Sequence, residues 1–416
     1  MEIKIPLYFK NCKVLSPHAL WCDMMPHMHP ILTLKPGKDK PIRHRHHWIF
    51  SGAIKHLDPC EDGDIVLVQD AHGERLGYAY VNHHTSITAR MINFGSDDPI
   101  VALQKNIGQA IAMREQLFNN QDTNAYRLIN SEGDGIPGLI ADKYADSLVV
   151  QSTTAGMDLL MPTVVETLEK HLSPACIYER SDAPSRREEK IEMKEGLLAG
   201  TMRDEVEIRE NGMKFFVSIS KGQKTGFFLD QREMRQWVRE HAKNKRVLNC
   251  FGYTGGFTAA ALVGGATQAD TIDISEDAIV MAEKNIELNG FNPEKNNFIV
   301  GDVFEYLRNE PLPYDLVVLD PPAFAKKKTD IVSACRGYKD INRLAIQKMP
   351  AGSTLVTSSC SYHVDERLFQ MVVFEAAHDA KRNVRIIGRH RQAPDHPINI
   401  FHPEGEYLKS LVLFVE

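Results

Sequence analysis

The sequence has few cysteines, and those it has are not arranged in pairs. Its seven cysteines are scattered along 416 residues, and no two of them stand at Cys-x-x-Cys spacing. An odd and scattered set argues against a disulfide framework and against a zinc finger. It indicates instead a protein that resides in a reducing compartment.

Long hydrophobic runs and an excess of positive charge are also missing. No apolar run approaches the roughly 20 residues of a membrane span, and polar residues and prolines interrupt the first thirty residues, which excludes a signal-peptide core. We therefore expect a soluble, cytoplasmic protein with no membrane partner. The 49 Lys and Arg residues against 55 Asp and Glu residues leave a net charge of −6, so any nucleic-acid site must be a local patch.

The patterns that are present indicate several domains, because 416 residues exceed the usual size of one. Residues 1–30 form an extension without a clear period, and we assign them no role. Residues 31–96 alternate β-branched runs with turn residues, which predicts a small β-barrel domain. Residues 97–205 mix helix and strand signals, which predicts a central α+β domain. Residues 206–416 repeat strand, turn and helix, which predicts an α/β, doubly wound, mostly parallel sheet with the tail LKSLVLFVE as an edge strand.

A glycine-rich loop and two carboxylates follow the first strands of the last domain, at the edge where open α/β sheets bind ligands. The strand at 246–249 leads into CFGYTGG, in which glycines such as Gly255 let the backbone approach a ligand closely. This loop lacks the G-x-G-x-x-G spacing that seats a pyrophosphate. Asp273 and Asp302 end the next two strands, where they can hold ribose hydroxyls and an adenine amino group. The set predicts S-adenosylmethionine; NAD binding, or a plain turn beside helix-capping carboxylates, is the alternative.

The fourth and fifth strands of the same domain predict the reacting groups. One strand ends at Asp320 of a DPPAF run, and the next ends in an SSCS run that holds Cys360. Such strands are usually neighbours, so we expect both side chains beside the methyl donor. A thiolate that adds to carbon 6 of cytosine makes carbon 5 nucleophilic, and a carboxyl group can bind the ring edge at nitrogen 3. We therefore interpret Cys360 as the nucleophile and Asp320 as the group that binds and activates the base.

Other interpretations of these two runs stay open. A lone cysteine at a strand end is also the pattern of a small buried thiol. Enzymes that methylate exocyclic amines typically have an aromatic residue directly after Asp/Asn-Pro-Pro. Here Ala323 takes that place and Phe324 comes one residue later, which is a modest argument for carbon methylation.

A basic patch near the start of the β domain predicts RNA binding. The stretch 35–55 carries six basic residues, including Arg43 and Arg45, against the single acid Asp39, and Trp48 lies among them. A solvated charge run is the alternative. Its histidines have no cysteine or carboxylate at ligand spacing, so no metal site is predicted.

Three lysines directly follow the DPPAF run. They are Lys326, Lys327 and Lys328. In this position they can contact the phosphates that flank a flipped base. A solvent-exposed loop without an RNA contact would have the same composition.

Five runs in order carry a family resemblance: NGMKFFVSISKGQKTGFFLDQR, NCFGYTGGF, DPPAF, ACRGYKDIN and PEGEYLKS. Together with RHRHHWIFSGAI, they resemble the bacterial PUA-domain-containing 23S rRNA (cytosine-C5) methyltransferases over nearly all of the chain after Ile31. The resemblance implies a PUA domain, a central domain and a Rossmann-like class I methyltransferase domain. It also implies S-adenosylmethionine as the methyl donor, large-subunit rRNA as the partner, and attack on the base by Cys360.

The resemblance also implies a set of residues that border the cofactor. By motif position these are Lys224, Thr225, Phe228, Asp230, Gln231, Asn249, Phe251, Tyr253, Thr254, Asp273, Asp302 and Asp320. Many RNA cytosine methyltransferases have a second cysteine after Asp-Pro, and its absence here leaves the base that releases the product unassigned. The alternatives are methylation of guanine or of an exocyclic amine in rRNA, and a PUA-type RNA-binding or assembly factor without catalysis. The oligomeric state is left open, with a homodimer as one option.

Overall fold

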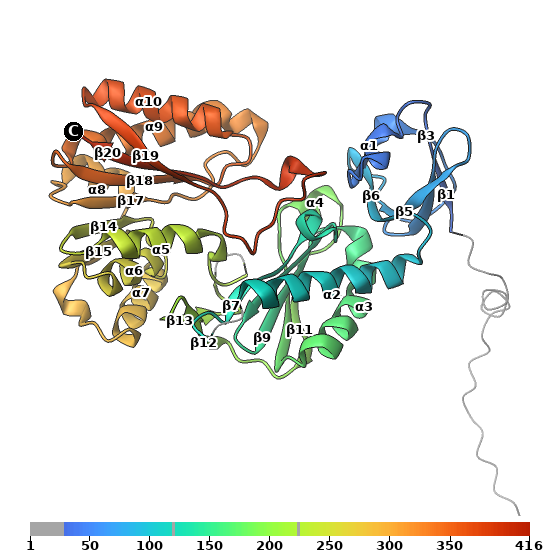
Figure 1. Ribbon diagram of the computed structural model, residues 1–416, viewed down its shortest axis with the longest axis horizontal. Coiled ribbons are helices and arrows are strands. Elements are labelled where there is room, and N and C mark those ends of the chain that lie inside the picture. The colour runs from blue at the N-terminus through green and yellow to red at the C-terminus, as the bar shows by residue number, and fades with distance from the viewer. Residues whose placement is uncertain (1–28, 119–120, 223–224) are drawn as a thin grey trace, which may run out of the picture.

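The computed structural model describes residues 29–118, 121–222 and 225–416, which form three larger sheets placed one after another (Figure 1). The first sheet has the order β2-β6-β5-β4-β1-β3. Its strands are β1 (Ile31–Leu34), β2 (Trp48–Phe50), β3 (Ile54–Leu57), β4 (Ile65–Gln69), β5 (Arg75–Val81) and β6 (Ile87–Phe94). Buried and partly buried positions alternate in β1 and β4 as their sequences predict. The basic stretch contributes the short helix α1 (Lys40–Arg43) and the strands β2 and β3.

The central sheet has the order β11-β10-β9-β8-β7. Its elements are β7 (Ala125–Asn130), β8 (Leu139–Tyr144), β9 (Ser147–Ser152), β10 (Cys176–Ser181) and β11 (Lys194–Gly200), with the helices α2 (Pro99–Leu117), α3 (Ala155–Leu172) and α4 (Ser185–Glu188). Apolar side chains of α2, α3 and the sheet form one core. Helix α2 begins where Asp98 accepts two backbone N–H groups, and α3 begins at the cap Thr154.

A two-stranded sheet of β12 (Glu205–Glu210) and β13 (Met213–Ser218) lies between the central and the last sheet. Its buried side chains share a core with Tyr144 and Val149 of the central sheet and with the last sheet. The domain boundary that the sequence predicts after residue 205 therefore lies where one continuous core packs both sides of the boundary together. The three domain limits themselves stay predictions.

The last sheet has the order β16-β15-β14-β17-β18-β20-β19. Its strands are β14 (Arg246–Cys250), β15 (Gln268–Asp273), β16 (Phe298–Val300), β17 (Leu316–Leu319), β18 (Ser353–Ser359), β19 (Val384–His390) and β20 (Lys409–Val415). Its helices are α5 (Arg232–His241), α6 (Gly256–Val263), α7 (Glu276–Leu288), α8 (Val303–Asn309), α9 (Ile331–Lys348) and α10 (Glu366–Ala380). Helices α5 to α7 pack in the core on one face of the sheet, and α8 to α10 pack in the core on the other. The prediction of a doubly wound, mostly parallel sheet is confirmed.

The predicted place of the tail strand is wrong. Strand β20 lies inside the sheet and pairs antiparallel with both β18 and β19, so β19 is the edge strand. The apolar run LVLFV within it is typical of an internal strand, and β20 is buried at six of its seven positions.

The connection from β19 to β20, here called the 391–408 segment, leaves the last sheet and runs past the central domain toward the first sheet (Figure 1). Asn130 of β7 donates to the Pro397 carbonyl at 3.0 Å, and the Asn399 amide donates to the Glu132 carbonyl at 3.4 Å. His402 of the segment contacts the ring of Trp48 in β2, with centroids 4.5 Å apart, so the segment that joins β19 to β20 reaches both other domains. Within the described ranges, no helix has the length and apolar character needed to cross a membrane.

Candidate active site

A cavity of about 310 Å³ lies at the carboxyl ends of the parallel strands of the last sheet. Its wall comes from the loops after β14 to β18, from the stretch before α5, and from Leu408. The predicted catalytic and cofactor-binding residues in this wall are Phe228, Asp230, Gln231, Phe251, Tyr253, Thr254, Asp273, Asp302, Asp320 and Cys360.

Backbone N–H groups hold the two carboxylates of the predicted cofactor set. Asp273 accepts the Tyr253 N–H and the Ser275 N–H, each at 2.9 Å. Asp302 caps α8 by accepting the Glu305 N–H at 3.0 Å. The helix-capping interpretation is therefore correct for Asp302, but the same residue also lines the cavity. A carboxylate offers about four lone-pair sites, so each of the two can cap a loop and still accept from a ligand.

The remaining wall fits a nucleoside-type cofactor. The hydroxyl of Thr254 and the amide oxygen of Gln231 are buried and have no hydrogen-bond partner among the residues that the structure describes. The rings of Phe251 and Phe304 contact each other edge to face in the same wall, with centroids 6.4 Å apart. Buried polar atoms normally have partners, so unsatisfied acceptors among apolar rings and carboxylates suit a ligand with hydroxyl and amino groups.

The predicted reacting groups lie at adjacent strand ends. Strands β17 and β18 are parallel neighbours in which Leu319 is opposite Thr357, so Asp320 and Cys360 reach the same cavity. Gln231 Nε2 donates to Asp320 Oδ1 at 2.7 Å, which fixes the orientation of the carboxylate. The Cys360 thiol lies 3.9 Å from the carbonyl oxygen of Pro321. Both groups therefore line one cavity at neighbouring strand ends, and their place beside the methyl donor stays a prediction.

Other residues of the predicted cofactor set are absent from the cavity wall. Thr225 is buried behind it and donates to Asp142, next to a second cavity that Arg127 and Tyr407 also line. The Asn249 amide donates to Thr258 Oγ1 at 3.0 Å inside the core. Gly255 caps α6 with φ +77°, a conformation that favours glycine. Lys224 lies outside the described residues.

Two residues of the PEGEYLKS run reach the site although the sequence assigned them no role. The Tyr407 hydroxyl donates to Asp230 Oδ2 at 2.7 Å. Lys409 Nζ donates to the carbonyl oxygens of Ser361 and Tyr407 at 2.6 and 2.7 Å. The run was a sequence signal for the site, because it is one of the runs that carry the family resemblance. Its side chains could not be placed from the sequence, because their position depends on β20 lying beside β18.

The charge count of the basic patch needs correction. Arg43 forms ion pairs with Asp39 at 2.6 Å, with Asp70 at 2.8 Å and with Glu74 at 2.6 Å. The fold brings Asp70 and Glu74 next to a stretch in which the sequence shows only one acid. Arg43 is therefore neutralised locally, and its proposed role with phosphates is weakened.

Two other residues of the patch take part in contacts with neighbouring domains. The Arg45 guanidinium lies 5.8 Å from the Phe401 ring centroid. The Trp48 indole donates to Glu132 of the central domain at 2.8 Å and contacts the ring of His402 at 4.5 Å. By contrast, Lys326, Lys327 and Lys328 are all exposed beside the Asp-Pro-Pro loop.

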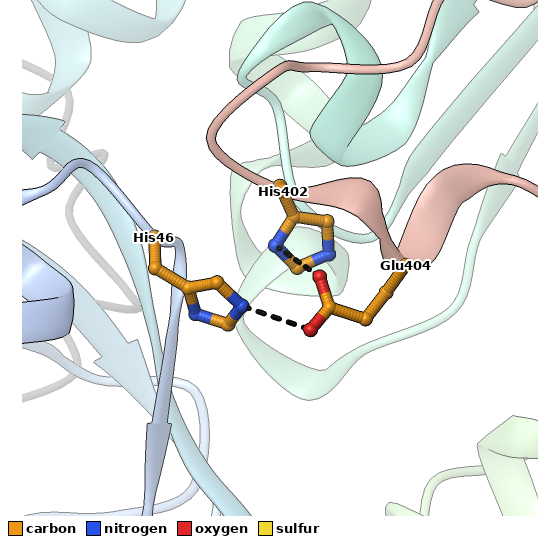
Figure 2. A group of neighbouring side chains, drawn as sticks. All are labelled: His46, His402 and Glu404. Atoms are coloured by element: carbon orange, nitrogen blue, oxygen red, sulfur yellow. Dashed lines mark hydrogen bonds and ion pairs between the residues drawn. The ribbon is translucent and has the colours of Figure 1, made fainter.

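A histidine–glutamate cluster joins the first domain to the 391–408 segment (Figure 2). Glu404 Oε1 lies 3.2 Å from His46 Nε2, and Glu404 Oε2 lies 3.7 Å from His402 Nδ1. The Trp48 backbone N–H donates to His46 Nδ1 at 3.2 Å, so the neutral His46 ring carries its proton on Nε2 and donates it to Glu404. A metal would need that nitrogen deprotonated. The hydrogen bonds therefore favour an interdomain contact over a metal centre.

Comparisons with known proteins agree with this architecture. The family model described as S-adenosylmethionine-dependent methyltransferase matches residues 186–405, and a PUA-like domain model matches residues 32–94. A putative SAM-dependent methyltransferase from Streptococcus mutans has the same fold, with a TM-score of 0.79 and 22% identity over 92% of this chain and 99% of that one. A structure of a putative methyltransferase complexed with SAH superposes equally well, with 22% identity, a TM-score of 0.79 and the same coverage.

Curated relatives cover almost the whole chain. The "Ribosomal RNA large subunit methyltransferase I" of Cronobacter sakazakii is 39% identical over 391 residues, which is 92% of this chain and 99% of the relative. The protein of the same name from Yersinia pseudotuberculosis is 41% identical over 387 residues, which is 91% of this chain and 98% of the relative. The chain therefore belongs to the family of the ribosomal RNA large subunit methyltransferase I proteins, and it is an S-adenosylmethionine-dependent methyltransferase with a PUA-like domain.

Proposed function

We propose that this protein methylates carbon 5 of a cytosine in large-subunit rRNA through a covalent intermediate between Cys360 and the base. The names of its relatives support rRNA as the substrate. The observation that carries the choice of reaction is the thiol of Cys360 and the carboxyl group of Asp320 in the wall of one cavity, beside the predicted cofactor residues.

The chemistry follows from these two side chains. The Cys360 thiolate adds to carbon 6, and the electron pair of the 5,6 double bond moves toward carbon 5. The carboxyl group of Asp320, oriented by Gln231, donates a proton to ring nitrogen 3 and so neutralises the negative charge that the addition puts on the ring. The bound cofactor supplies an electrophilic methyl group. Loss of the carbon-5 proton to a base then reforms the double bond and releases the thiolate from carbon 6.

The residue order after Asp-Pro-Pro supports carbon methylation over amine methylation, because Ala323 comes first and Phe324 second. Phe324 is engaged with other aromatic rings, 4.6 Å from the Tyr338 centroid and 6.0 Å from the Phe304 centroid. It packs against the core around Tyr338 and also lines the cavity, one residue later than the aromatic of amine-methylating sites. Guanine methylation remains the second candidate, and modification mapping of rRNA from cells without the protein separates the two.

The variant Cys360→Ala tests the mechanism. We expect methyl transfer to 23S rRNA to fall at least about a thousandfold, because the activating addition is lost, while S-adenosylhomocysteine binding measured by calorimetry stays unchanged. Cys335→Ala is the matched control, since Cys335 is a partly buried cysteine on α9. Methyl transfer at the normal rate by Cys360→Ala would eliminate the thiol mechanism.

The substrate surface is proposed from charge and exposure. Lys326, Lys327 and Lys328 are exposed next to the loop that carries Asp320, so they are suited to contact phosphates close to the target base. Arg45 and Trp48 would contact RNA at the far end of the 391–408 segment. Arg43 contributes less, because three carboxylates surround it.

A further inference from the structure

We propose that Lys409 is a positioning residue whose ammonium group holds the Cys360 thiol in its thiolate form. This inference rests on the proposed role of Cys360 as the nucleophile, and it assigns a function to a side chain of β20 that does not touch the base. An ordinary cysteine is only a few per cent thiolate at neutral pH, so a nucleophilic cysteine needs a nearby positive charge or a base.

The strand register brings the lysine to the end of the strand that carries the thiol. In the antiparallel pair of β18 and β20, Ser359 is opposite Lys409, and Cys360 is the next residue after Ser359. Lys409 Nζ donates to the Ser361 carbonyl at 2.6 Å, so the ammonium is bound to the residue on the other side of Cys360. A second bond to the Tyr407 carbonyl at 2.7 Å fixes its direction. Neighbours of Cys360 on both sides in the chain thus place the cation.

Burial makes this cation effective. Lys409 is only 7% exposed, and charges interact more strongly where water is excluded. Burial lowers the pKa of Lys409 to about 8, and the negative charge of Cys360 acts in the opposite direction. Each group therefore favours the charged form of the other. Asp365 and Glu406 also face the ammonium and favour its protonated form.

Among the described residues, the other titratable groups recorded around the thiol are one carboxyl group and two phenols. Asp320 lines the same cavity and, when it is ionised, disfavours a thiolate. Tyr338 from α9 and Tyr407 from the 391–408 segment both interact electrostatically with Cys360. Burial raises the pKa of both phenols, so they stay neutral hydrogen-bonding groups at physiological pH. Of these described groups around the thiol, Lys409 is the one whose positive charge can offset the effect of Asp320 on the thiolate.

The test is the pH dependence of Cys360 alkylation by iodoacetamide, followed on the full-length protein by peptide mass spectrometry between pH 5.5 and 10. We expect Lys409→Met to raise the midpoint of the Cys360 profile by about one unit, so that the rate at pH 7 falls about tenfold. Lys409→Arg keeps the charge and should retain most of the wild-type midpoint. Cys335 in the same digests is the internal reference and should not change.

The possible outcomes distinguish loss of the positive charge of Lys409 from a change in the structure around Cys360. If the Lys409→Met rate reaches the wild-type value at pH 10, the thiol is still accessible and the lost cation explains the shift. An unchanged midpoint, or a rate reduced by the same factor at every pH, would overturn the proposal. Because alkylation needs neither RNA nor S-adenosylmethionine, its result is independent of the proposed reaction. Methyl transfer by Cys360→Ala would overturn that reaction and leave the alkylation profile valid.

Discussion

Asp395→Asn should detach the 391–408 segment from its anchor and destabilise the protein strongly. Asp395 is fully buried. Its carboxylate lies 3.0 Å from Arg232 Nη1 and accepts the Arg127 backbone N–H at 2.9 Å. Its carbonyl oxygen accepts from Arg114 Nη2 at 2.8 Å. One residue therefore connects the segment to β7, to α2 and to the start of α5.

The magnitude follows from the charge that the substitution leaves behind. Arg232 is 1% exposed, and its other carboxylate, Glu210, lies 3.6 Å away and is shared with Arg235. Removal of one partner of a buried ion pair costs about 3–5 kcal/mol, because the remaining charge stays buried without compensation. We expect a decrease of that size in the free energy of unfolding at pH 7.

The pH dependence has a definite sign. Burial alone would raise the pKa of Asp395, but the charges of Arg232 and His396 hold it well below its ordinary value. A carboxylate with a lowered folded-state pKa stabilises the fold above its unfolded pKa of about 3.9, and this contribution is lost as the pH falls through the folded pKa. The wild-type protein should therefore lose stability below about pH 4 more steeply than the variant.

Urea unfolding at pH 7 and at pH 3.5 measures both effects. Glu406→Gln is the matched control, because Glu406 lies on the same segment but pairs with the half-exposed Arg391 at 2.6 Å. An exposed pair of this kind contributes less than about 1 kcal/mol. If Asp395→Asn cost no more than the control at pH 7, the reasoning about the buried anchor would be refuted.

Further predictions concern the ligands. Asp273→Ala should weaken S-adenosylhomocysteine binding at least about tenfold in calorimetry, because a charge-assisted hydrogen bond is lost; unchanged affinity would remove Asp273 from the cofactor site. Replacement of all three lysines at 326–328 by Gln should lower the salt dependence of RNA binding by about two units of slope, and an unchanged slope would make them a solvated loop. Arg45→Glu should weaken RNA binding more than Arg43→Glu, since carboxylates already neutralise Arg43; the opposite order would contradict this assignment.

The parts of the fold that follow from local patterns could be predicted from the sequence. Alternation of strand and helix signals predicts the parallel sheet, and the carboxyl-edge rule then brings Asp320 and Cys360 to one cavity. The antiparallel position of β20 could not be predicted, because an apolar run of five residues such as LVLFV can form a strand at several places in a sheet. The role of Lys409 depends on that position.

Contacts between residues far apart in the sequence also could not be predicted. Asp70 and Glu74 neutralise Arg43, although a count of charges within the stretch gives an excess of cations. His402 and Glu404 meet His46 across more than 350 positions of the sequence. Such partners are set by tertiary packing, and no period or spacing in the chain encodes them.

The central claim is that Cys360 forms a covalent bond with cytosine, and trapping that bond tests it most directly. Large-subunit rRNA that contains 5-fluorocytosine is incubated with the protein and S-adenosylmethionine. After methyl transfer, carbon 5 of this base carries fluorine in place of the proton that a base would remove, so the bond between Cys360 and carbon 6 cannot be released. We predict a stable protein–RNA adduct, with the nucleotide mass on the peptide that contains Cys360 and no adduct for Cys360→Ala. Turnover on ordinary rRNA without any adduct on the fluorinated RNA, or an adduct on another residue, would contradict the account.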